Sequence, residues 1–333
     1  VPESICTKQA KDGKGIVGVI DQDFNLLDTL HYAVDVGEIN SHNTFPIDEN
    51  NSFYIVTTKR LHRFDWDGTD LSQGWEAQYD FVNDGPVGTF AEGSGTTPTL
   101  MGWGPGNDKL VVIADGHNRN NLVAFWREVP AGWTGIAGHD FRFADSIRIP
   151  LATSFSNTFQ SIENSPTVFG YDVGIAQFNG FLGYGCNNEK GVQKISWDTT
   201  SNQFNVAWQQ DTINMNGVLT YSQGSNMVYC SGKEADCNYY YYGLDWATGV
   251  MKLRLLLGPE GTFTDDPYYN GGNNNIIDED GNIYFPGGAS LVKVEIAQAA
   301  VGLEEAVGSA WGVYPNPARG SLRVRHDFTG PGN

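Results

Sequence analysis

Short runs of β-branched, aromatic and aliphatic residues recur along the chain, and clusters of Gly, Asn, Asp and Ser separate them. Such runs include Phe53–Thr57, Leu110–Ala114 and Asn282–Phe285. Helical periodicity is nearly absent. Strand-length apolar runs with closely spaced turn residues are typical of antiparallel sheets, so the pattern predicts an all-β fold.

The same order of segments returns at regular intervals. A polar cluster, here called an anchor, precedes a short strand five times, at spacings of roughly 50 to 70 residues. The anchors are Ser41–Thr44, Ser94–Pro98, Glu163–Pro166, Asn214–Gly217 and Asn273–Asn275. Several strands per such period are typical of propeller blades. We therefore predict a single β-propeller with four-stranded antiparallel blades.

The number of blades depends on the ends of the chain. Five anchors favour five blades. Six blades are the alternative if the N-terminal hairpin, Ile16–Ile20 with Asn25–Leu30, is the remaining half of another blade. Joining this hairpin to the last blade would close the ring and remove exposed sheet edges.

The net charge of the chain limits the classes of molecule that it can bind. The chain of 333 residues has 39 acidic against 20 basic residues and a net charge of −19. Nucleic-acid binding needs a basic footprint, so we expect none. No apolar run reaches ~18 residues, so we expect no membrane insertion. The chain opens with Val1 and no basic, apolar signal segment, and we expect that an export signal has been removed.

Four cysteines suit an oxidising compartment, and four permit three pairings. Cys230 and Cys237 flank a short polar loop between two β-like runs, which predicts a local disulfide between them. Cys6 and Cys186 are left as a second pair, with nothing local to link them. No pair of Cys-x-x-Cys motifs is present, which argues against a zinc site of that kind.

The segment Val313–Val324 indicates where the protein is located. Its Tyr314–Pro317 opening, followed by alternating apolar residues at Leu322, Val324 and Phe328, resembles the start of the type A sorting domain carried by cargo of the bacterial type IX secretion system. Complete domains of that family are longer. The resemblance implies a protein secreted or held at the outer cell surface, with the type IX machinery as a partner. We accordingly divide the chain into a propeller (1–295), a linker (296–310) and a truncated sorting domain (311–333).

Two further resemblances concern the propeller. Leu244–Gly249 resembles the turn of PQQ-like repeats, while Ser94–Met101, Glu163–Pro166 and Asp278–Tyr284 resemble a little-characterised family of exported bacterial propellers. This likeness covers most of residues 40–295 and implies the fold alone. The adjacent-cysteine disulfide of quinoprotein dehydrogenases is missing, so we do not expect PQQ as a cofactor.

The anchors are the candidate ligand site. The first strand of a propeller blade is innermost, so the anchors should meet at one mouth of the channel. Their amide and hydroxyl groups both donate and accept, as sugars require. The predicted ligand-binding residues are His42, Asn43, Thr96, Thr97, Glu163, Asn164, Asn216 and Asn274. The alternative is that such residues only satisfy backbone groups in crowded turns.

A catalytic interpretation needs a titratable centre. Glu163 is the carboxylate within an anchor, His42 is the anchor histidine, and His117 lies in the turn Asp115–Arg119. A histidine acting as general base with Glu163 would suit a polysaccharide lyase or glycosidase. The alternative is that His117 is a solvated turn residue.

Calcium is the one cofactor that the sequence suggests, and only weakly. Carboxylates alternate beside glycine at Asp65, Asp67 and Asp70 and again at Asp278 and Asp280, as in oxygen-rich calcium loops. The same sequences are ordinary β-turn chemistry. Among the aromatics, Trp103 and Trp133 lie in Gly/Pro-rich loops and are candidate sugar-stacking platforms, whereas Tyr239–Tyr242 must point alternately to the two faces of a strand.

The leading hypothesis is a secreted or surface propeller that binds a glycan, another polar small molecule or a surface protein at the channel mouth. The alternatives are a polysaccharide lyase or glycosidase that uses Glu163 with His42 or His117, and a structural scaffold that assembles with copies of itself.

Overall fold

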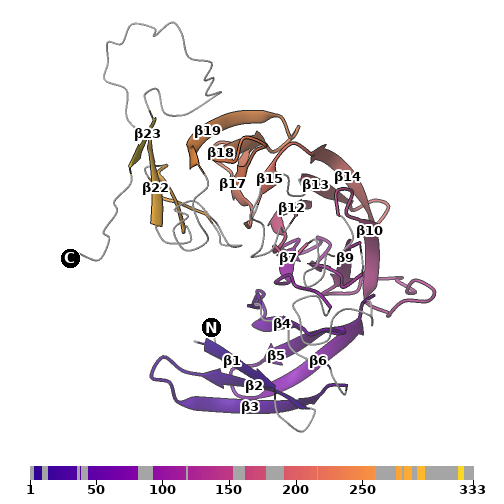
Figure 1. Cartoon of the computed structure of the whole chain (residues 1–333). Helices are drawn as coiled ribbons and strands as arrows, with labels where there is room; N and C mark the ends of the chain where they lie inside the picture. Colours follow the sequence, from indigo (N-terminus) through magenta and orange to yellow (C-terminus); the bar gives the residue numbers. More distant parts are fainter. Residues whose placement is uncertain are drawn as a thin grey trace, which may run out of the picture. The chain divides into compact units, whose positions relative to one another are not determined.

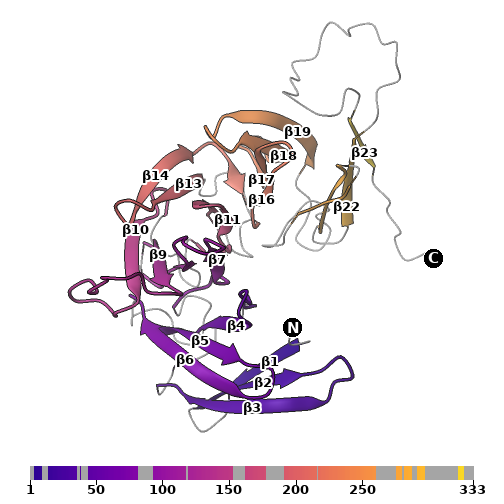
Figure 2. The ribbon, with the colours of Figure 1, turned by 180° about the vertical axis from the view of Figure 1, so that it is seen from behind.

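The computed structural model consists of strands and turns, and no helix occurs among the residues that it describes (Figures 1 and 2). The predicted all-β class is confirmed. The described residues are 4–9, 14–35, 38, 44–81, 93–117, 119–152, 162–177, 191–215, 217–259, 275–279, 281–286, 291–296 and 322–325.

The described strands form six sheets, and each sheet takes its strands from one continuous stretch of chain or nearly so. The N-terminal sheet contains β1 (Ser4–Gln9), β2 (Lys14–Ile20) and β3 (Leu26–Ala33). The second contains β4 (Ser52–Val56), β5 (Arg60–Trp66) and β6 (Leu71–Gln78). The third contains β7 (Thr99–Met101), β8 (Leu110–Ala114), β9 (Asn121–Trp126) and β10 (Phe143–Arg148).

The remaining sheets follow the same plan. The fourth contains β11 (Thr167–Phe169), β12 (Asp172–Ala176), β13 (Val192–Asp198) and β14 (Gln203–Gln210). The fifth contains β15 (Asn214–Met215), β16 (Thr220–Ser222), β17 (Met227–Lys233), β18 (Asn238–Asp245) and β19 (Met251–Pro259). The sixth contains β20 (Ile276–Ile277), β21 (Ile283–Pro286), β22 (Leu291–Ile296) and β23 (Leu322–Arg325).

Strand order within the sheets is up-and-down. The third sheet runs β7-β8-β9-β10 and the fourth runs β11-β12-β13-β14. The second sheet gains the start of a further strand through an antiparallel bridge between Ile47 and Phe53. Antiparallel pairing is seen throughout the third sheet, for example between β8 and β9. Consecutive four-stranded up-and-down sheets are the unit from which propellers are built.

The chain divides into two compact units, Val1–Val173 with Ser196–Asn205 and Gly174–Ile195 with Val206–Asn333. The first unit holds the first three sheets and the second holds the last two. The boundary passes through β12, β13 and β14 of the fourth sheet.

At both ends of the chain, a strand pairs in a way that the sequence did not predict. The N-terminal hairpin β2–β3 pairs with β1, a strand that the sequence analysis did not predict. Local pairing of this kind closes only a short loop, at a small entropic cost. The sixth sheet takes its fourth strand from β23, which lies within the segment assigned to the sorting domain and pairs with β22.

Both faces of the second sheet are buried in the first unit. Phe53 and Ile55 of β4 share a core cluster with Val17 of β2, whereas the intervening Tyr54 and Val56 belong to a cluster with the third sheet. Side chains alternate between the faces of a strand, so one strand serves two cores. Each large apolar side chain buried in this way contributes about 1.5–3 kcal/mol.

The second unit repeats this arrangement with tyrosines. Tyr239 and Tyr241 of β18 pack with Phe285 and its neighbours in the sixth sheet, while Tyr240 and Tyr242 pack with Trp208 and its neighbours on the other face. All four tyrosines are buried. The sequence-based expectation of alternating faces is therefore confirmed.

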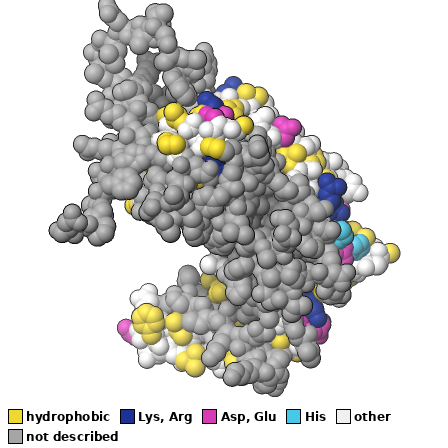
Figure 3. Space-filling view, viewed as in Figure 1, with side chains coloured by type: hydrophobic (Ala, Val, Ile, Leu, Met, Phe, Trp, Pro, Cys, Tyr) yellow, Lys and Arg dark blue, Asp and Glu magenta, His cyan; other side chains and the backbone are white. Residues whose placement is uncertain are grey.

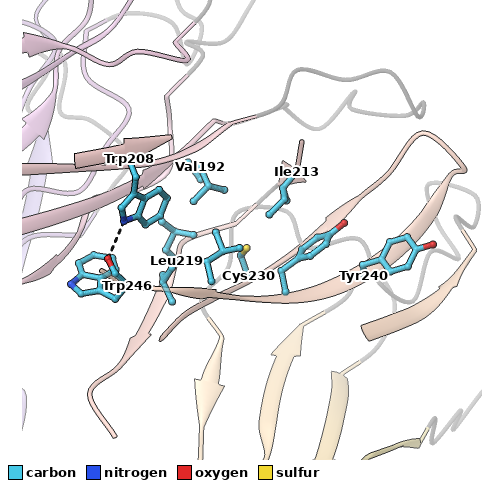
Figure 4. Packing of buried hydrophobic residues seen from close by; sticks show 11 residues of the cluster. Val192, Trp208, Ile213, Leu219, Cys230, Tyr240 and Trp246 are labelled. Carbon is cyan, nitrogen blue, oxygen red and sulfur yellow. Dashed lines mark hydrogen bonds between the residues drawn. The ribbon is translucent and has the colours of Figure 1, made fainter. Parts of the chain in front are cut away.

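The predicted disulfide between Cys230 and Cys237 is wrong. Cys230 is a free thiol, buried in the cluster of Trp208, Leu219 and Trp246 (Figure 4). It lies within β17 opposite Tyr242, whereas Cys237 lies in the turn that leads to β18. Several strand residues, at about 3.3 Å each, separate Cys230 from Cys237. The distance between their Cα atoms therefore exceeds the ~7 Å that a disulfide can bridge.

Candidate functional site

The candidate site lies at the end of the sheets where the first strands begin. Thr97 and Pro98 lead into β7, and Ser165 and Pro166 lead into β11, so the two anchors carry a proline at the same place. Proline has no N–H to donate and is tolerated at strand starts and edges. In an up-and-down sheet, the turn between the second and third strands lies at this same end.

The second anchor of the first unit contacts both the first and the third anchor. The hydroxyl oxygens of Thr44 and Thr97 are 3.4 Å apart. The backbone N–H of Thr97 donates to Ser165 Oγ at 3.0 Å. The hydroxyl of Thr99 donates to the carbonyl of Pro166 at 2.9 Å. Residues from three separate stretches of sequence are thus neighbours.

The second unit contains a comparable contact. The hydroxyl of Thr220, on β16, donates to the carbonyl of Asn275 in the last anchor at 3.0 Å. The side chain of Asn275 is buried, with 5% of the residue exposed, and among the described residues neither its carboxamide oxygen nor its nitrogen has a hydrogen-bond partner. Buried amides are nearly always hydrogen-bonded, so Asn275 is an exception that calls for a partner.

Glu163 stands directly against the preceding anchor. Its carboxylate occupies the place where a Cβ of residue 95 would lie, so a larger residue than Gly95 would require the Glu163 side chain to move. The neighbouring Ile162 donates its backbone N–H to Asn120 Oδ1 at 3.2 Å, which fixes the anchor against the turn after β8. Glu163 itself is half-buried.

Two of the predicted ligand-binding residues are buried. Thr96 is fully buried, and its hydroxyl accepts the N–H of Ala114 and bonds Ser94 Oγ, both at 3.0 Å. Asn164 is also buried. The accessible residues of these anchors, here called the anchor rim, are Thr44, Thr97, Glu163 and Ser165. His42, Asn43, Asn216 and Asn274 lie outside the described residues.

His117 belongs to a tight turn. Its N–H donates to Asp115 Oδ1 at 3.1 Å, and its Nδ1 accepts the N–H of Arg119 at 3.4 Å. The buried carboxylate of Asp115 also accepts the N–H of Asn121 at 2.8 Å and the Asn121 side-chain amide. Burial raises the pKa of Asp115 to about 6, although these hydrogen bonds oppose the shift. Raised carboxyl pKa values occur at catalytic sites. The Asp115 carboxylate, however, is already hydrogen-bonded to groups of its own turn.

A buried ionic cluster near the anchors escaped the sequence analysis. Glu38, of which 1% is exposed, accepts hydrogen bonds from Arg60 Nη1 at 2.8 Å, from the Asp35 N–H at 2.9 Å and from the Thr57 hydroxyl. His62 Nε2 lies 3.8 Å from its Oε1. Burial alone would raise the pKa of Glu38, but the nearby His62 and the hydrogen bonds from Thr57 and from the Asp35 N–H lower it to about 2.

The cluster is connected to the second anchor through one tyrosine. Tyr79 donates its hydroxyl proton to the carbonyl of Thr57 and accepts the N–H of Ser94 at 2.9 Å. Glu38 carries no motif, and its partners lie on β5 and in the connection between β4 and β5, about twenty residues away in the sequence. The sequence therefore held no signal for the cluster. Its place in the structure indicates a rigid base beneath the anchor rim.

Among the predicted calcium ligands Asp65, Asp67 and Asp70, the Asp67 carboxylate serves a turn and the Asp65 carboxylate binds an arginine. Oδ1 of Asp67 accepts the backbone N–H groups of Thr69 and Asp70, both at 2.8 Å. Oδ1 of Asp65 accepts Arg63 Nε at 2.7 Å. These contacts are typical Asx-turn and ion-pair chemistry.

Asp278 is similarly engaged. Its Oδ1 accepts the backbone N–H of Asn282 at 2.8 Å, and its Oδ2 accepts the Asn282 side-chain amide at 2.8 Å and the Tyr284 hydroxyl at 3.1 Å. Asp280 lies outside the described residues. Within the described part of the chain, no three His, Cys, Asp or Glu side chains are placed to hold a metal ion.

One curated relative shares sequence with the chain. The chain is 29% identical over 268 residues to an uncharacterised protein of Archaeoglobus fulgidus, and the match covers 74% of this chain and 51% of the relative. The chain therefore spans about half the length of that relative. No protein-family model matches the chain.

Solved structures show a distant likeness at 10% identity. One is a chain of a mitotic checkpoint complex (TM-score 0.45, 88% of this chain and 73% of that chain). Another is a europium-containing methanol dehydrogenase (0.44, 76% and 51%). A third, from Bacteroides uniformis, was provisionally assigned as a 6-phosphogluconolactonase (0.48, 97% and 80%). The description of the fold rests on the sheets themselves.

Across the part of the chain that the structure describes, no helix has the length and apolar character of a membrane span.

Proposed function

We propose that this chain is an exported β-propeller that binds a polar, carbohydrate-like ligand, or a surface partner of similar chemistry, at the anchor rim. One observation carries the proposal: Thr97 contacts both Thr44 and Ser165, so residues of three anchors lie together at one end of the sheets. Convergence of separate loops on a rigid scaffold is the usual construction of a binding site.

The chemistry of the rim favours a neutral, polyhydroxylated ligand. The hydroxyls of Thr44, Thr97 and Ser165 can each donate and accept, and the Glu163 carboxylate accepts only. A net charge of −19 disfavours polyanions. The buried amide of Asn275, in the second unit, offers a donor and an acceptor of the same kind.

For the architecture, we infer that the six sheets are six blades. The N-terminal sheet has three strands of its own and shares a core with the second sheet, which supports six blades over five. Closure of the blades into a ring stays part of the proposal. A crystal structure with five blades would contradict it.

For localisation, we propose a secreted or outer-surface protein exported by the type IX machinery. The support is the resemblance of Tyr314–Pro317 and the following alternation to a type A sorting domain. A reporter fused to a full-length sorting domain that begins with residues 311–333 would test it. Periplasmic retention of the reporter would contradict it.

The ligand proposal is tested by isothermal titration calorimetry with xylohexaose, laminarihexaose and mannohexaose. We expect at least one of them to bind the wild type and to bind Thr97→Ala and Glu163→Gln about tenfold more weakly. Thr29→Ala, which removes an exposed hydroxyl from β3, is the matched control and should bind as the wild type does. Unchanged affinity in both rim variants, or no binding of any of the three, would overturn the proposal.

The lyase or glycosidase alternative rests on one observation, the raised pKa of Asp115 beside His117 and close to the Glu163 anchor. Its carboxylate is closed off by its own turn, so we place this alternative second. Release of reducing ends from a neutral polysaccharide, lost in Glu163→Gln, would reverse that order.

The scaffold alternative also has one observation in its favour. The tip of the β2–β3 hairpin exposes Phe24, Leu26 and Leu27, with Phe24 82% exposed, and Figure 3 shows hydrophobic side chains at the lower left, over the N-terminal sheet. A stable dimer in light scattering that Phe24→Ser dissociates would favour self-assembly.

A further inference from the structure

The third sheet carries two long connections at the end opposite the anchors. Residues 102–109 join β7 to β8, and residues 127–142 join β9 to β10. In an up-and-down sheet these two connections share one end. The β5–β6 connection in the second sheet, residues 67–70, is short by comparison. In repeat folds, insertions confined to the loops of one face often mark a binding face.

Trp103 is the exposed aromatic residue of the first connection. Half of it is exposed, and the guanidinium carbon of Arg127 lies 5.0 Å from its ring centroid. Arg127 is almost fully buried and is fixed by hydrogen bonds to the carbonyls of Leu110 at 3.1 Å and Met101 at 3.3 Å, and to Glu49 Oε2 at 2.9 Å. The indole therefore rests on a rigid cationic base.

Polar groups surround this base. Lys109 Nζ lies 2.9 Å from Glu49 Oε1 and 2.8 Å from Glu128 Oε1. Burial would raise the pKa of Glu49, but hydrogen bonds from its own backbone, Lys109 and Arg127 lower it to about 2, so it is ionised over the whole physiological range. Glu49 and Glu128 keep part of their surface open.

The loop also holds Trp103 in place from the backbone side. Asn107 Nδ2 donates to the Trp103 carbonyl at 2.5 Å. Gly102 has φ of +74°, and a Cβ there would collide with the carbonyl oxygen of Asp108, so the turn before Trp103 requires glycine. Single exposed apolar side chains are common on proteins, but most are not fixed from both sides in this way.

We propose that Trp103, with Glu49 and Glu128 beside it, binds a pyranose ring of a neutral polysaccharide. The apolar C–H face of the sugar stacks on the open face of the indole, and sugar hydroxyls donate to the two carboxylates. Tryptophan suits this role because it offers a large, rigid apolar surface. This site lies at the opposite end of the sheet from the anchor rim and does not depend on the function proposed there.

Affinity electrophoresis in native gels tests the proposal, with hydroxyethylcellulose, soluble xylan, laminarin, galactomannan or alginate cast into the gel. We expect one or more of the four neutral polysaccharides to retard the wild type, and alginate to leave it unaffected. Trp103→Ala should lower the apparent affinity for that polysaccharide about tenfold, and Trp103→Phe should keep most of the retardation.

Two controls make the outcome decisive. Phe24→Ala removes an even more exposed aromatic ring from the same unit and should migrate like the wild type. Circular dichroism confirms that Trp103→Ala is folded, as expected for a side chain that is half exposed. The proposal is overturned if no neutral polysaccharide retards the protein, if only alginate does, or if Trp103→Ala is retarded as strongly as the wild type.

Discussion

A single thiol shows how burial decides the chemistry of a residue in this molecule. Burial raises the pKa of Cys230 to about 12, and only the thiolate reacts with alkylating agents. We expect iodoacetamide at pH 8 to leave Cys230 unmodified in the folded protein and to label it after unfolding in guanidinium chloride. Peptide mass spectrometry reads out both states. Rapid labelling of Cys230 in the folded protein would contradict the packing described above.

Asp115 provides a pH-dependent test at the same scale. Burial raises its pKa to about 6 from a reference of 3.8, so the folded protein binds the proton more tightly than the unfolded chain does. Stability from this group is therefore gained as the pH falls from 7 to 5 and is absent above the folded pKa. By linkage the gain is roughly 1 kcal/mol.

Urea unfolding of the wild type and of Asp115→Asn at pH 7 and pH 5 measures this contribution. Other carboxyl groups titrate in both proteins, so the difference between the two pH dependences isolates Asp115. We expect the wild type to gain about 1 kcal/mol more than the variant on going to pH 5. An identical pH dependence would mean that Asp115 is not desolvated as the structure has it.

The same kind of turn precedes two strands, β4 and β21. Asp48 Oδ1 accepts the Ser52 N–H at 3.0 Å and its Oδ2 accepts the Tyr54 hydroxyl at 2.7 Å. Asp278 makes the corresponding bonds to Asn282 and Tyr284. A carboxylate that accepts from both a backbone N–H and a tyrosine six residues on ties the turn to the following strand.

This role separates turn chemistry from calcium binding at Asp278. We expect Asp278→Ala to lower the free energy of unfolding by about 1–2 kcal/mol, because at least two hydrogen bonds are lost. The loss should be the same in 5 mM CaCl₂ and in EDTA, as measured by urea unfolding. A wild type that calcium stabilises, with an effect absent in Asp278→Ala, would show that this turn holds the ion.

The sequence was informative about elements because their signals are local. Alternating apolar runs, Asp-Gly and Asn-containing turns and repeated polar anchors lie within a few residues of one another. They predicted several strands of the second to sixth sheets, among them β4, β8 and β21. The strand β1 was missed because Ser4–Gln9 has a mixed pattern and is ordered by pairing with β2. The Cys230–Cys237 bridge was wrong because spacing alone does not reveal how far a hairpin register extends.

The candidate site was predicted in part for the same reason. Contacts between Thr44, Thr97 and Ser165 follow from a repeat that the sequence displays. Which anchor residues are open and which are buried does not follow, because Thr96 and Thr97 are chemically alike and only packing against β8 distinguishes them. The role of Glu38 was not predicted because its partners come from distant segments. The unbonded carboxamide of Asn275 was not predicted because it depends on which distant groups surround it.

Within the first unit, the repeated sheets form a scaffold that brings three short polar anchors together. Two units with the same internal plan, each with both faces of a sheet buried, supply the rigidity that such a site needs. With a net charge of −19, we expect the protein to disfavour anionic partners. Ligand binding at the anchor rim is the central claim, because the fold alone does not specify a function.

Hydrogen–deuterium exchange with mass spectrometry tests that claim most directly. Exchange is followed in the free protein and with xylohexaose, laminarihexaose and mannohexaose in turn, each at millimolar concentration. We expect one of these sugars to slow exchange in the peptides that cover residues 94–98 and 162–166, and Glu163→Gln to abolish that protection. Unchanged exchange in both segments with all three sugars, or protection confined to other parts of the chain, would contradict the account.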